Sequence, residues 1–191
     1  MSGIRQFDEQ IVLPIVLDIF WNKGWQATSF VEIAQVTGVQ RGSLYNAYGS
    51  KEALFLHAYK IYTDNFIKNV KKAMVGDSLQ DVLRGFFKTA LENMTKGTPS
   101  RGCLTTKMLI EIDVTSEQIQ QSIRDFMNDL KLIMVVRLSE KNLEKSLSIT
   151  AEEAAEVILT FVRGIAVMER MHKDPQKLMT IYEAFICSFI N

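Results

Sequence analysis

Apolar residues recur every three or four positions along most of the chain, which is the spacing of helices with one buried face. The first such segment runs from about Asp8 to Lys23 and is followed by Gly24, a residue typical of helix ends. Its repeating apolar positions are Ile11, Val12, Ile15, Val16, Ile19 and Phe20. Pro14 lies within this range. Because proline removes a backbone hydrogen bond and crowds the preceding turn, we expect a kink there or a helix that begins near Leu13.

The same spacing, combined with capping residues, predicts eight further helices and hence about nine in all. Ser29 and Glu32 stand at capping-box spacing, and Gly38 follows as a stop. The expected ranges are Thr28–Gly38, Gln40–Ala47, Lys51–Met74, Ser78–Thr95, Cys103–Ile112, Ser116–Lys145, Thr150–Lys173 and Pro175–Phe189. Almost no strand-like alternation appears between them. The sequence therefore predicts an all-α fold with short connecting turns.

Two short helices around Gly38 have the spacing of a helix-turn-helix. Ala34 is small where the two helices would cross, and Gly38 can take the left-handed conformation that the turn requires. Leu44, six residues later, would anchor the second helix in the core. Any helical hairpin can contain these three residue types, so the motif alone leaves DNA binding open.

The predicted exposed face of the second helix carries the functional signal. It offers Gln40, Arg41, Ser43, Tyr45 and Asn46 and no acidic residue. Arg pairs with guanine edges, Asn and Gln pair with adenine, and Ser and Tyr can hold phosphates. Three further candidates for phosphate contact lie at neighbouring helix starts, namely Thr28, Ser29 and Lys51. Alternatively, Ser29 and Ser50 serve only as helix caps, and Tyr48 packs beneath the motif.

Four segments resemble the amino-terminal domain of TetR-family transcriptional regulators: 24–34, 38–39, 42–45 and 50–55. The resemblance implies an all-helical homodimer with a three-helix DNA-binding domain in residues 1–50, and a ligand-binding and dimerisation domain in residues 51–191. The helix at 51–74 would connect the two. It also implies which residues stand where family members touch DNA: Thr28, Ser29, Arg41, Ser43, Tyr45, Asn46, Tyr48 and Lys51.

The function that the resemblance implies is that of a cytoplasmic regulator, commonly a repressor, released from a palindromic double-stranded DNA operator by a small-molecule inducer. The segment Asn46-Ala47-Tyr48-Gly49 departs from the common family pattern, in which an aromatic residue, a histidine, a phenylalanine and a polar or basic residue are frequent. Base preference therefore does not carry over from the family.

The two carboxy-terminal helices are too apolar for a surface position. Residues 157–168 would carry apolar side chains nearly all around the helix, and the last helix shows the same excess. We expect these helices to pair with their copies across a twofold axis. The predicted interface residues are Phe161, Ile165, Met168, Ile181, Phe185 and Phe189. A large monomer core is the alternative.

The middle helices contain a soft, aromatic-rich set of side chains. Most of them would be core, but a Met-rich lining adapts to apolar ligands, and a bundle interior is a usual place for a pocket. The candidate pocket residues are Phe66, Phe86, Met94, Cys103, Met108, Phe126, Met127 and Met134. Cys103 follows Arg101 closely, an arrangement that favours thiol reactivity, so a redox or electrophile sensor stands beside a simple packing role. Cys187 is expected to pack.

Composition narrows the remaining possibilities. The chain has 191 residues, of which 47% are hydrophobic, and 22 basic residues balance 22 acidic ones, so DNA binding must depend on local features. Two cysteines and two histidines at unrelated positions predict neither a disulfide framework nor a metal site, and no cofactor is expected. No secretory signal or membrane-length apolar run is found.

Two other function classes stay open on sequence grounds. The first is a small helical enzyme acting on an apolar substrate. The pair Glu111 and Asp113 could supply its catalytic carboxylates, but residues two apart point to different helix faces. The second is a helical ligand carrier that has lost DNA binding. His57 and His172 lack companions for catalysis.

Overall fold

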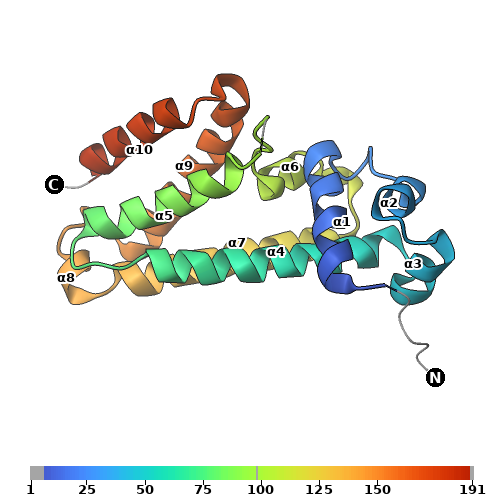
Figure 1. Cartoon of the computed structure of the whole chain (residues 1–191). Coiled ribbons are helices and arrows are strands. Elements are labelled where there is room, and N and C mark those ends of the chain that lie inside the picture. Colours follow the sequence, from blue (N-terminus) through green and yellow to red (C-terminus); the bar gives the residue numbers. More distant parts are fainter. Residues whose placement is uncertain (1–6, 98, 190–191) are drawn as a thin grey trace.

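The computed structural model describes residues 7–97 and 99–189, and for Phe189 the backbone only. Within these residues the chain forms ten α-helices and one 3₁₀ turn at Ile112–Val114 (Figure 1). The helices are α1 (Glu9–Lys23), α2 (Phe30–Thr37), α3 (Arg41–Tyr48), α4 (Lys51–Ala73), α5 (Leu79–Met94), α6 (Leu104–Ile110), α7 (Glu117–Leu138), α8 (Lys141–Glu144), α9 (Ala151–His172) and α10 (Pro175–Phe189). The predicted all-α class is confirmed.

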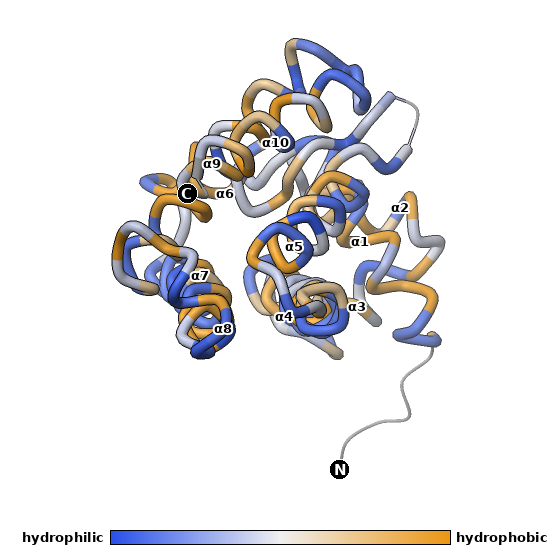
Figure 2. Tube along the Cα trace, turned by 90° about the vertical axis from the view of Figure 1, so that its left-hand side faces the viewer, coloured by the Kyte–Doolittle hydropathy of each residue, from blue (hydrophilic) through white to orange (hydrophobic). Residues whose placement is uncertain are grey.

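The helices form a small cluster joined to a longer bundle. Helices α1 to α3 gather at one end, and α4 runs from them along the length of the molecule beside α7 (Figure 1). Seen from the α8 end, α4 and α5 lie beside α7, with α9 and α10 above them (Figure 2). Helix α1 packs on α4, α7 packs on α9, and α10 packs on α5. Helix α4 therefore belongs to both parts.

Short polar side chains begin most of the helices. Ser29 Oγ accepts a hydrogen bond from Glu32 N at 3.1 Å, and Ser50 Oγ accepts one from Ala53 N at 3.0 Å. Thr150 and Glu153 form a complete capping box at the start of α9. Each cap satisfies a backbone donor that has no partner inside the helix. These local signals explain why the predicted starts agree with the observed ones within a residue or two.

The expectation that the first helix could begin near Leu13 is wrong. Helix α1 begins at Glu9 and continues through Pro14. Asp8 caps it by accepting a hydrogen bond from Gln10 N at 2.8 Å, which secures one turn before the proline. Residues on both sides of Pro14 pack in the core, so tertiary packing offsets the lost backbone hydrogen bond.

The predicted helix Ser116–Lys145 is also wrong in extent, because it divides into α7 and α8 at Ser139 and Glu140. Arg137 stands at this break, where its Nε donates to Met74 O at 2.9 Å and a second nitrogen donates to Gly76 O. These bonds tie the end of α7 to the α4–α5 turn. Helix α6 likewise ends at Ile110, earlier than expected, and gives way to the 3₁₀ turn.

A single hydrophobic core extends through both parts of the molecule. Phe20 and Trp21 of α1 are fully buried, as are Phe55 and Tyr59 of α4. The rings of Phe20 and Phe55 meet edge to face, with centroids 5.0 Å apart. The α1–α3 cluster therefore shares its core with the bundle. None of the helices in the described ranges is long and apolar enough to cross a membrane.

Candidate functional site

Helices α2 and α3 meet in the arrangement that the motif predicts. Gly38 has φ 69° and ψ 6°, in the left-handed region that favours glycine. Leu44 is completely buried, and Ala34 is partly buried against the same core. The predicted roles of Gly38 in the turn and of Leu44 as the anchor are confirmed.

Helix α3 turns a polar face outward. Gln40, Arg41, Tyr45 and Asn46 are exposed, and Ser43 is partly exposed. Arg41 lies over the Tyr45 ring, 5.3 Å from its centroid. Ser29, at the start of α2, is exposed as well. We call these six residues the α3 surface: Ser29, Gln40, Arg41, Ser43, Tyr45 and Asn46.

Two of the predicted contact residues turn inward. Thr28 is 2% exposed, and its hydroxyl donates to Gly24 O at 2.7 Å. Tyr48 is 7% exposed, and its hydroxyl donates to Glu9 Oε1 at 2.6 Å. The Tyr48 ring also packs edge-on against His57. Thr28 and Tyr48 therefore support the motif from beneath.

Lys51 is largely committed to the fold. Its Nζ donates to Trp25 O at 2.9 Å and to Thr28 O at 3.0 Å, and it lies 4.0 Å from the centroid of the Trp25 ring. Partial burial lowers the pKa of Lys51, and the nearby Glu111 carboxylate opposes this shift. An ammonium group has three N–H donors, so one stays available for a phosphate.

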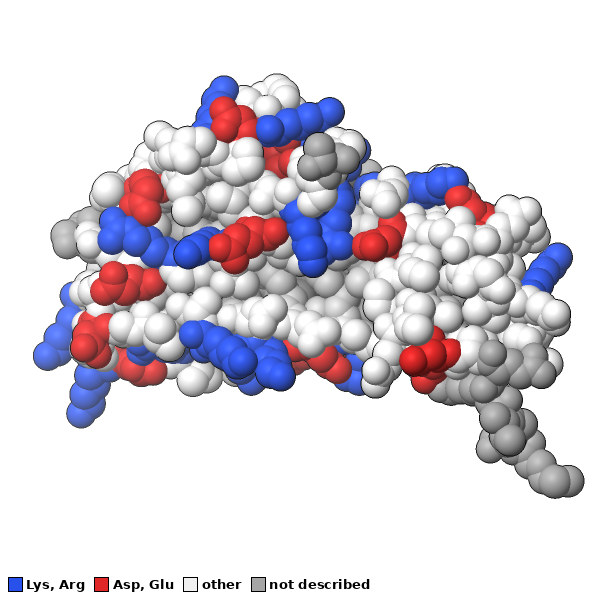
Figure 3. Space-filling model, in the orientation of Figure 1, with Lys and Arg blue, Asp and Glu red and all other residues white. Residues whose placement is uncertain are grey.

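Charge is sparse around this surface. Figure 3 shows that the end of the molecule carrying α2 and α3 is mostly uncharged, with Lys and Arg concentrated elsewhere on that face. Lys23, at the end of α1, is paired with Glu32 of α2. Phosphate binding at this end therefore depends on a few cations and on the amino-terminal N–H groups of the helices.

Side chains from α6 and its end hold the α1–α2 turn. Glu111 Oε2 accepts hydrogen bonds from Trp25 N at 2.7 Å and from Gln26 N at 3.0 Å. Gly24 has φ 84°, and a Cβ at this position would overlap the Glu111 carboxylate. Lys107 Nζ donates to Trp21 O at 2.6 Å. Nothing in the sequence pattern connects these residues, because they are separated by about 85 positions.

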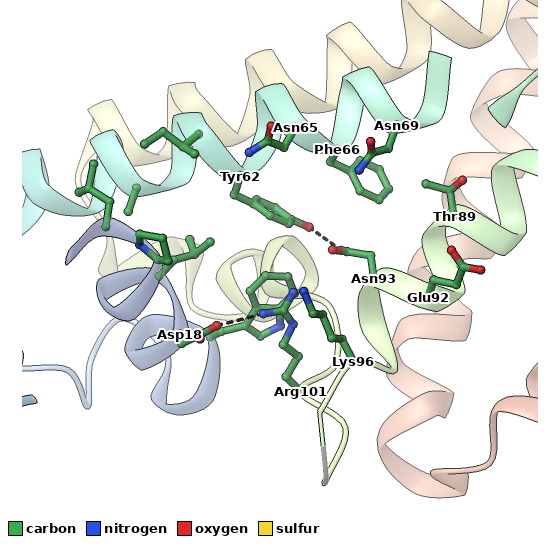
Figure 4. Close-up of a pocket in the computed structure, with 16 residues that line it drawn as sticks. Asp18, Tyr62, Asn65, Phe66, Asn69, Thr89, Glu92, Asn93, Lys96 and Arg101 are labelled. Atoms are coloured by element: carbon green, nitrogen blue, oxygen red, sulfur yellow. Dashed lines mark hydrogen bonds and ion pairs between the residues drawn. The ribbon is translucent and has the colours of Figure 1, made fainter. Parts of the chain in front are cut away.

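A cavity with a volume of about 520 Å³ lies between α1, α4 and α5 (Figure 4). Of the predicted pocket residues, Phe66 lines it. Its polar lining includes Asp18, Tyr62, Asn93 and Arg101, none of which was predicted (Figure 4). Burial raises the pKa of Tyr62, so its hydroxyl stays protonated and can donate a hydrogen bond.

The other predicted pocket residues do not gather around this cavity. Met94, Cys103 and Phe126 join Phe66 at a separate void of only about 10 Å³. There Arg163 Nη1 lies 3.4 Å from Cys103 Sγ. The remaining residues pack in the core, with Phe86, Met108 and Met134 fully buried and Met127 partly buried.

The predicted interface residues divide between the core and the surface. Ile165 is buried, and Phe161 stacks on Phe185 with centroids 4.0 Å apart. Ile181 is partly buried, and Met168 is exposed. The side chain of Phe189 lies outside the described residues. Helix α9 carries an exposed stripe, and Met168 is the one predicted interface residue on it. The other members of the stripe were not predicted: Val157, Thr160, Gly164, Val167 and Met171.

Comparison with known families gives two matches that together cover most of the chain. Residues 17–58 match the family described as bacterial regulatory proteins, tetR family. Residues 80–185 match the tetracyclin repressor-like C-terminal domain. The first match contains α2 and α3, and the second contains most of the bundle.

Individual relatives are distant. The HTH-type transcriptional repressor ComR of Escherichia coli is 23% identical over 183 residues, which cover 93% of this chain and 86% of ComR. The uncharacterised HTH-type regulator YezE of Bacillus subtilis is 27% identical over 114 residues, so the match spans only 58% of either protein.

Solved structures share the fold. The reduced form of Escherichia coli NemR superposes with a TM-score of 0.85 at 16% identity and covers 96% of each chain. A cysteine mutant of the TetR-family regulator CifR, complexed with a 26-base-pair operator, superposes with a TM-score of 0.84 at 20% identity and covers 97% of this chain and 98% of CifR.

Replacing Glu111 with Ala tests whether this carboxylate holds the α1–α2 turn. Two backbone donors lose their partner, so we expect Glu111→Ala to lower the free energy of unfolding by about 1–3 kcal/mol. Amide exchange at Trp25 and Gln26 should accelerate. Asp113→Ala, an exposed carboxylate two residues away, is the matched control and should change neither quantity. Equal effects of the two variants would contradict the assigned role.

Proposed function

Because the chain belongs to the TetR family of bacterial regulatory proteins, we propose that it binds operator DNA through the α3 surface and is released by a small-molecule inducer. The observation that carries this proposal is the outward-facing polar face of α3, which holds no acidic residue. The transcriptional regulators ComR and CifR, which are similar to this chain, support a DNA target. Its site of action would then be the cytoplasm, where the chromosome lies.

Each residue of the proposed interface has a role set by its chemistry. Arg41 and Asn46 carry side chains suited to guanine and adenine edges, and Gln40 is a further candidate for adenine. Ser29, Tyr45 and the remaining N–H of Lys51 would hold phosphates and set the register. We propose residues 1–50 as the DNA-binding domain and residues 51–191 as the domain for ligand binding and dimerisation.

A homodimer is the second part of the proposal. The α9 stripe leaves four sizeable apolar side chains exposed, Val157, Val167, Met168 and Met171, with the small Gly164 among them. Burying such a stripe against its copy stabilises an association through the hydrophobic effect. A twofold axis through α9 and α10 would present two α3 helices to successive major-groove faces about 34 Å apart.

The enzyme alternative draws no support from its one carboxylate pair, because Glu111 is occupied by the α1–α2 turn. Within residues 7–97 and 99–189, no three His, Cys, Asp or Glu side chains lie close enough to hold a metal ion. YezE and ComR, to which the chain is similar, are transcriptional regulators. A ligand carrier would differ from a regulator in showing no preference for any DNA sequence, which the following titration measures.

Selection of genomic fragments by the purified full-length chain tests the function directly. We expect nanomolar binding to a palindromic sequence, weakening steeply as salt rises because bound counterions are released from the phosphates. The measurement is a fluorescence-anisotropy titration at several salt concentrations, with a scrambled duplex as control. Equal affinity for selected and scrambled duplexes would exclude sequence-specific regulation.

Arg41→Ala tests base reading by the α3 surface. We expect a loss of about 1–3 kcal/mol on the selected operator and a smaller loss on scrambled DNA, so that specificity relaxes. Tyr45→Phe should weaken both duplexes alike, because the Tyr45 hydroxyl would contact phosphate and the ring that packs on Phe30 is kept. Arg124→Ala, on the bundle surface, controls for lost charge. A uniform loss for Arg41→Ala would contradict its role as a base reader.

Val167→Glu tests the proposed dimer interface. A carboxylate on the α9 stripe would be buried opposite its own copy, so the variant should sediment as a monomer and lose at least tenfold in operator affinity. Leu132→Glu places the same charge on an exposed apolar position of α7 and is the matched control. A dimeric Val167→Glu variant would overturn the assignment of this face.

A further inference from the structure

The 520 Å³ cavity, which we call the junction cavity, lies where the DNA-binding part meets the bundle. Helix α1 contributes five lining residues at the spacing of a single helix face: Leu13, Pro14, Leu17, Asp18 and Trp21. Helices α4 and α5 and the segment that follows α5 supply the rest (Figure 4). A molecule in this cavity would therefore touch the proposed DNA-binding domain directly.

One part of the cavity wall is apolar. It is formed by Leu13 and Leu17 of α1 together with Ala58, Ile61 and Phe66 of α4. The cavity volume is typical of sites for small organic ligands, which combine apolar walls with a few polar groups. This wall fits an aromatic or aliphatic body.

The polar end of the cavity holds hydrogen-bond donors without acceptors. The Arg101 guanidinium lies 3.5 Å from the centroid of the Trp21 ring, and its Nη1 donates to Asp18 at 3.0 Å. Its Nε is buried and has no hydrogen-bond partner. Lys96 also lines the cavity, and its ammonium group has no partner among the described residues. Asn93 Nδ2 donates to the Tyr62 hydroxyl at 3.1 Å, which leaves the Tyr62 hydrogen free to point elsewhere.

The two carboxylates that line the cavity already face cations. Asp18 is paired with Arg101, and Glu92 lies 4.0 Å from Lys88. Lys96 therefore adds an uncompensated positive charge beside the unused Arg101 donor. A ligand that supplies anionic oxygen atoms would satisfy both groups.

Building on the regulatory function proposed above, we propose that the junction cavity is the effector site and that it binds a hydrophobic carboxylate. The apolar body packs against α1 and α4, and the carboxylate accepts hydrogen bonds from Arg101 and Lys96. This site includes a helix of the DNA-binding part, unlike the pocket inside the bundle that the Met-rich pattern predicts.

Binding there would act on α1 through Arg101. The ligand carboxylate binds the same guanidinium as Asp18, so its negative charge weakens the attraction between Arg101 and Asp18. This loosens the tie between α1 and the segment that precedes α6. In that segment Gly102 O accepts a hydrogen bond from Trp21 Nε1 at 2.8 Å. Because α1 also packs on α2, loosening this tie changes the position of the α3 surface. A ligand shifts such an equilibrium by its difference in affinity for the two states.

The first arm of the test examines ligand class with 2-naphthoate as the probe and 2-naphthamide as its uncharged counterpart. Calorimetry on the full chain should give one naphthoate site per chain and at least tenfold weaker binding of the amide. Arg101→Gln and the exposed Lys96→Gln should each weaken naphthoate binding at least fivefold. Arg124→Gln is the charge control and should leave it unchanged. Absence of saturable naphthoate binding, or equal binding of acid and amide, would overturn the proposed class.

The second arm fills the cavity covalently, so it does not depend on the affinity of a free ligand. In a Cys103→Ser, Cys187→Ser background, Ile61→Cys places a thiol at the cavity wall, and reaction with N-phenylmaleimide fills the cavity covalently. We expect operator affinity to fall at least tenfold after this reaction. Val75→Cys, an exposed aliphatic position beyond α4, receives the same group and should stay within twofold.

The unreacted background protein separates the two proposals. Operator binding by this protein together with an unchanged affinity after labelling at Ile61→Cys would overturn the effector site and leave the regulatory function intact. Failure of the unreacted protein to prefer its selected operator would instead count against the regulatory function itself.

Discussion

The fold depends on how the end of α1 is attached to the segment that contains α6. The last carbonyl groups of a helix and the N–H groups of the following turn lack partners within the helix itself. Here Lys107 satisfies carbonyls at the end of α1, and Glu111 satisfies two N–H groups of the α1–α2 turn. Lys51 completes the arrangement from the start of α4. Charged side chains from two other helices therefore fix the orientation of the α2–α3 pair.

This attachment explains why the molecule has one continuous core although its two parts have different proposed tasks. Trp21 packs edge-on against Tyr62 with centroids 5.0 Å apart, and it carries Arg101 on its face. The same residue thus contacts α4, the start of the α6 segment and the junction cavity. A structural change at any of these three places reaches α1 through direct packing, without an intermediate element.

The polar members of the junction cavity explain the limits of sequence reasoning at this site. Asp18, Tyr62, Asn93 and Arg101 lie on different elements and share no periodicity. Apolar periodicity finds core positions, and so it selected buried residues such as Phe86 and Met108 as pocket candidates. Close packing left those residues only a void of water size or none at all, because cores fill their interior at high density.

The sequence by itself determined the helices, their capped starts, the left-handed turn at Gly38 and the polar face of α3. Each of these follows from neighbouring residues through hydrogen bonds or periodicity that act over a few positions. Only the tertiary structure decided that α1 passes through Pro14, that α7 ends at Leu138, and that Thr28, Tyr48 and Lys51 turn inward. Those outcomes depend on partners far away in the chain, and the spacing of residues along a sequence carries no information about which distant groups will meet.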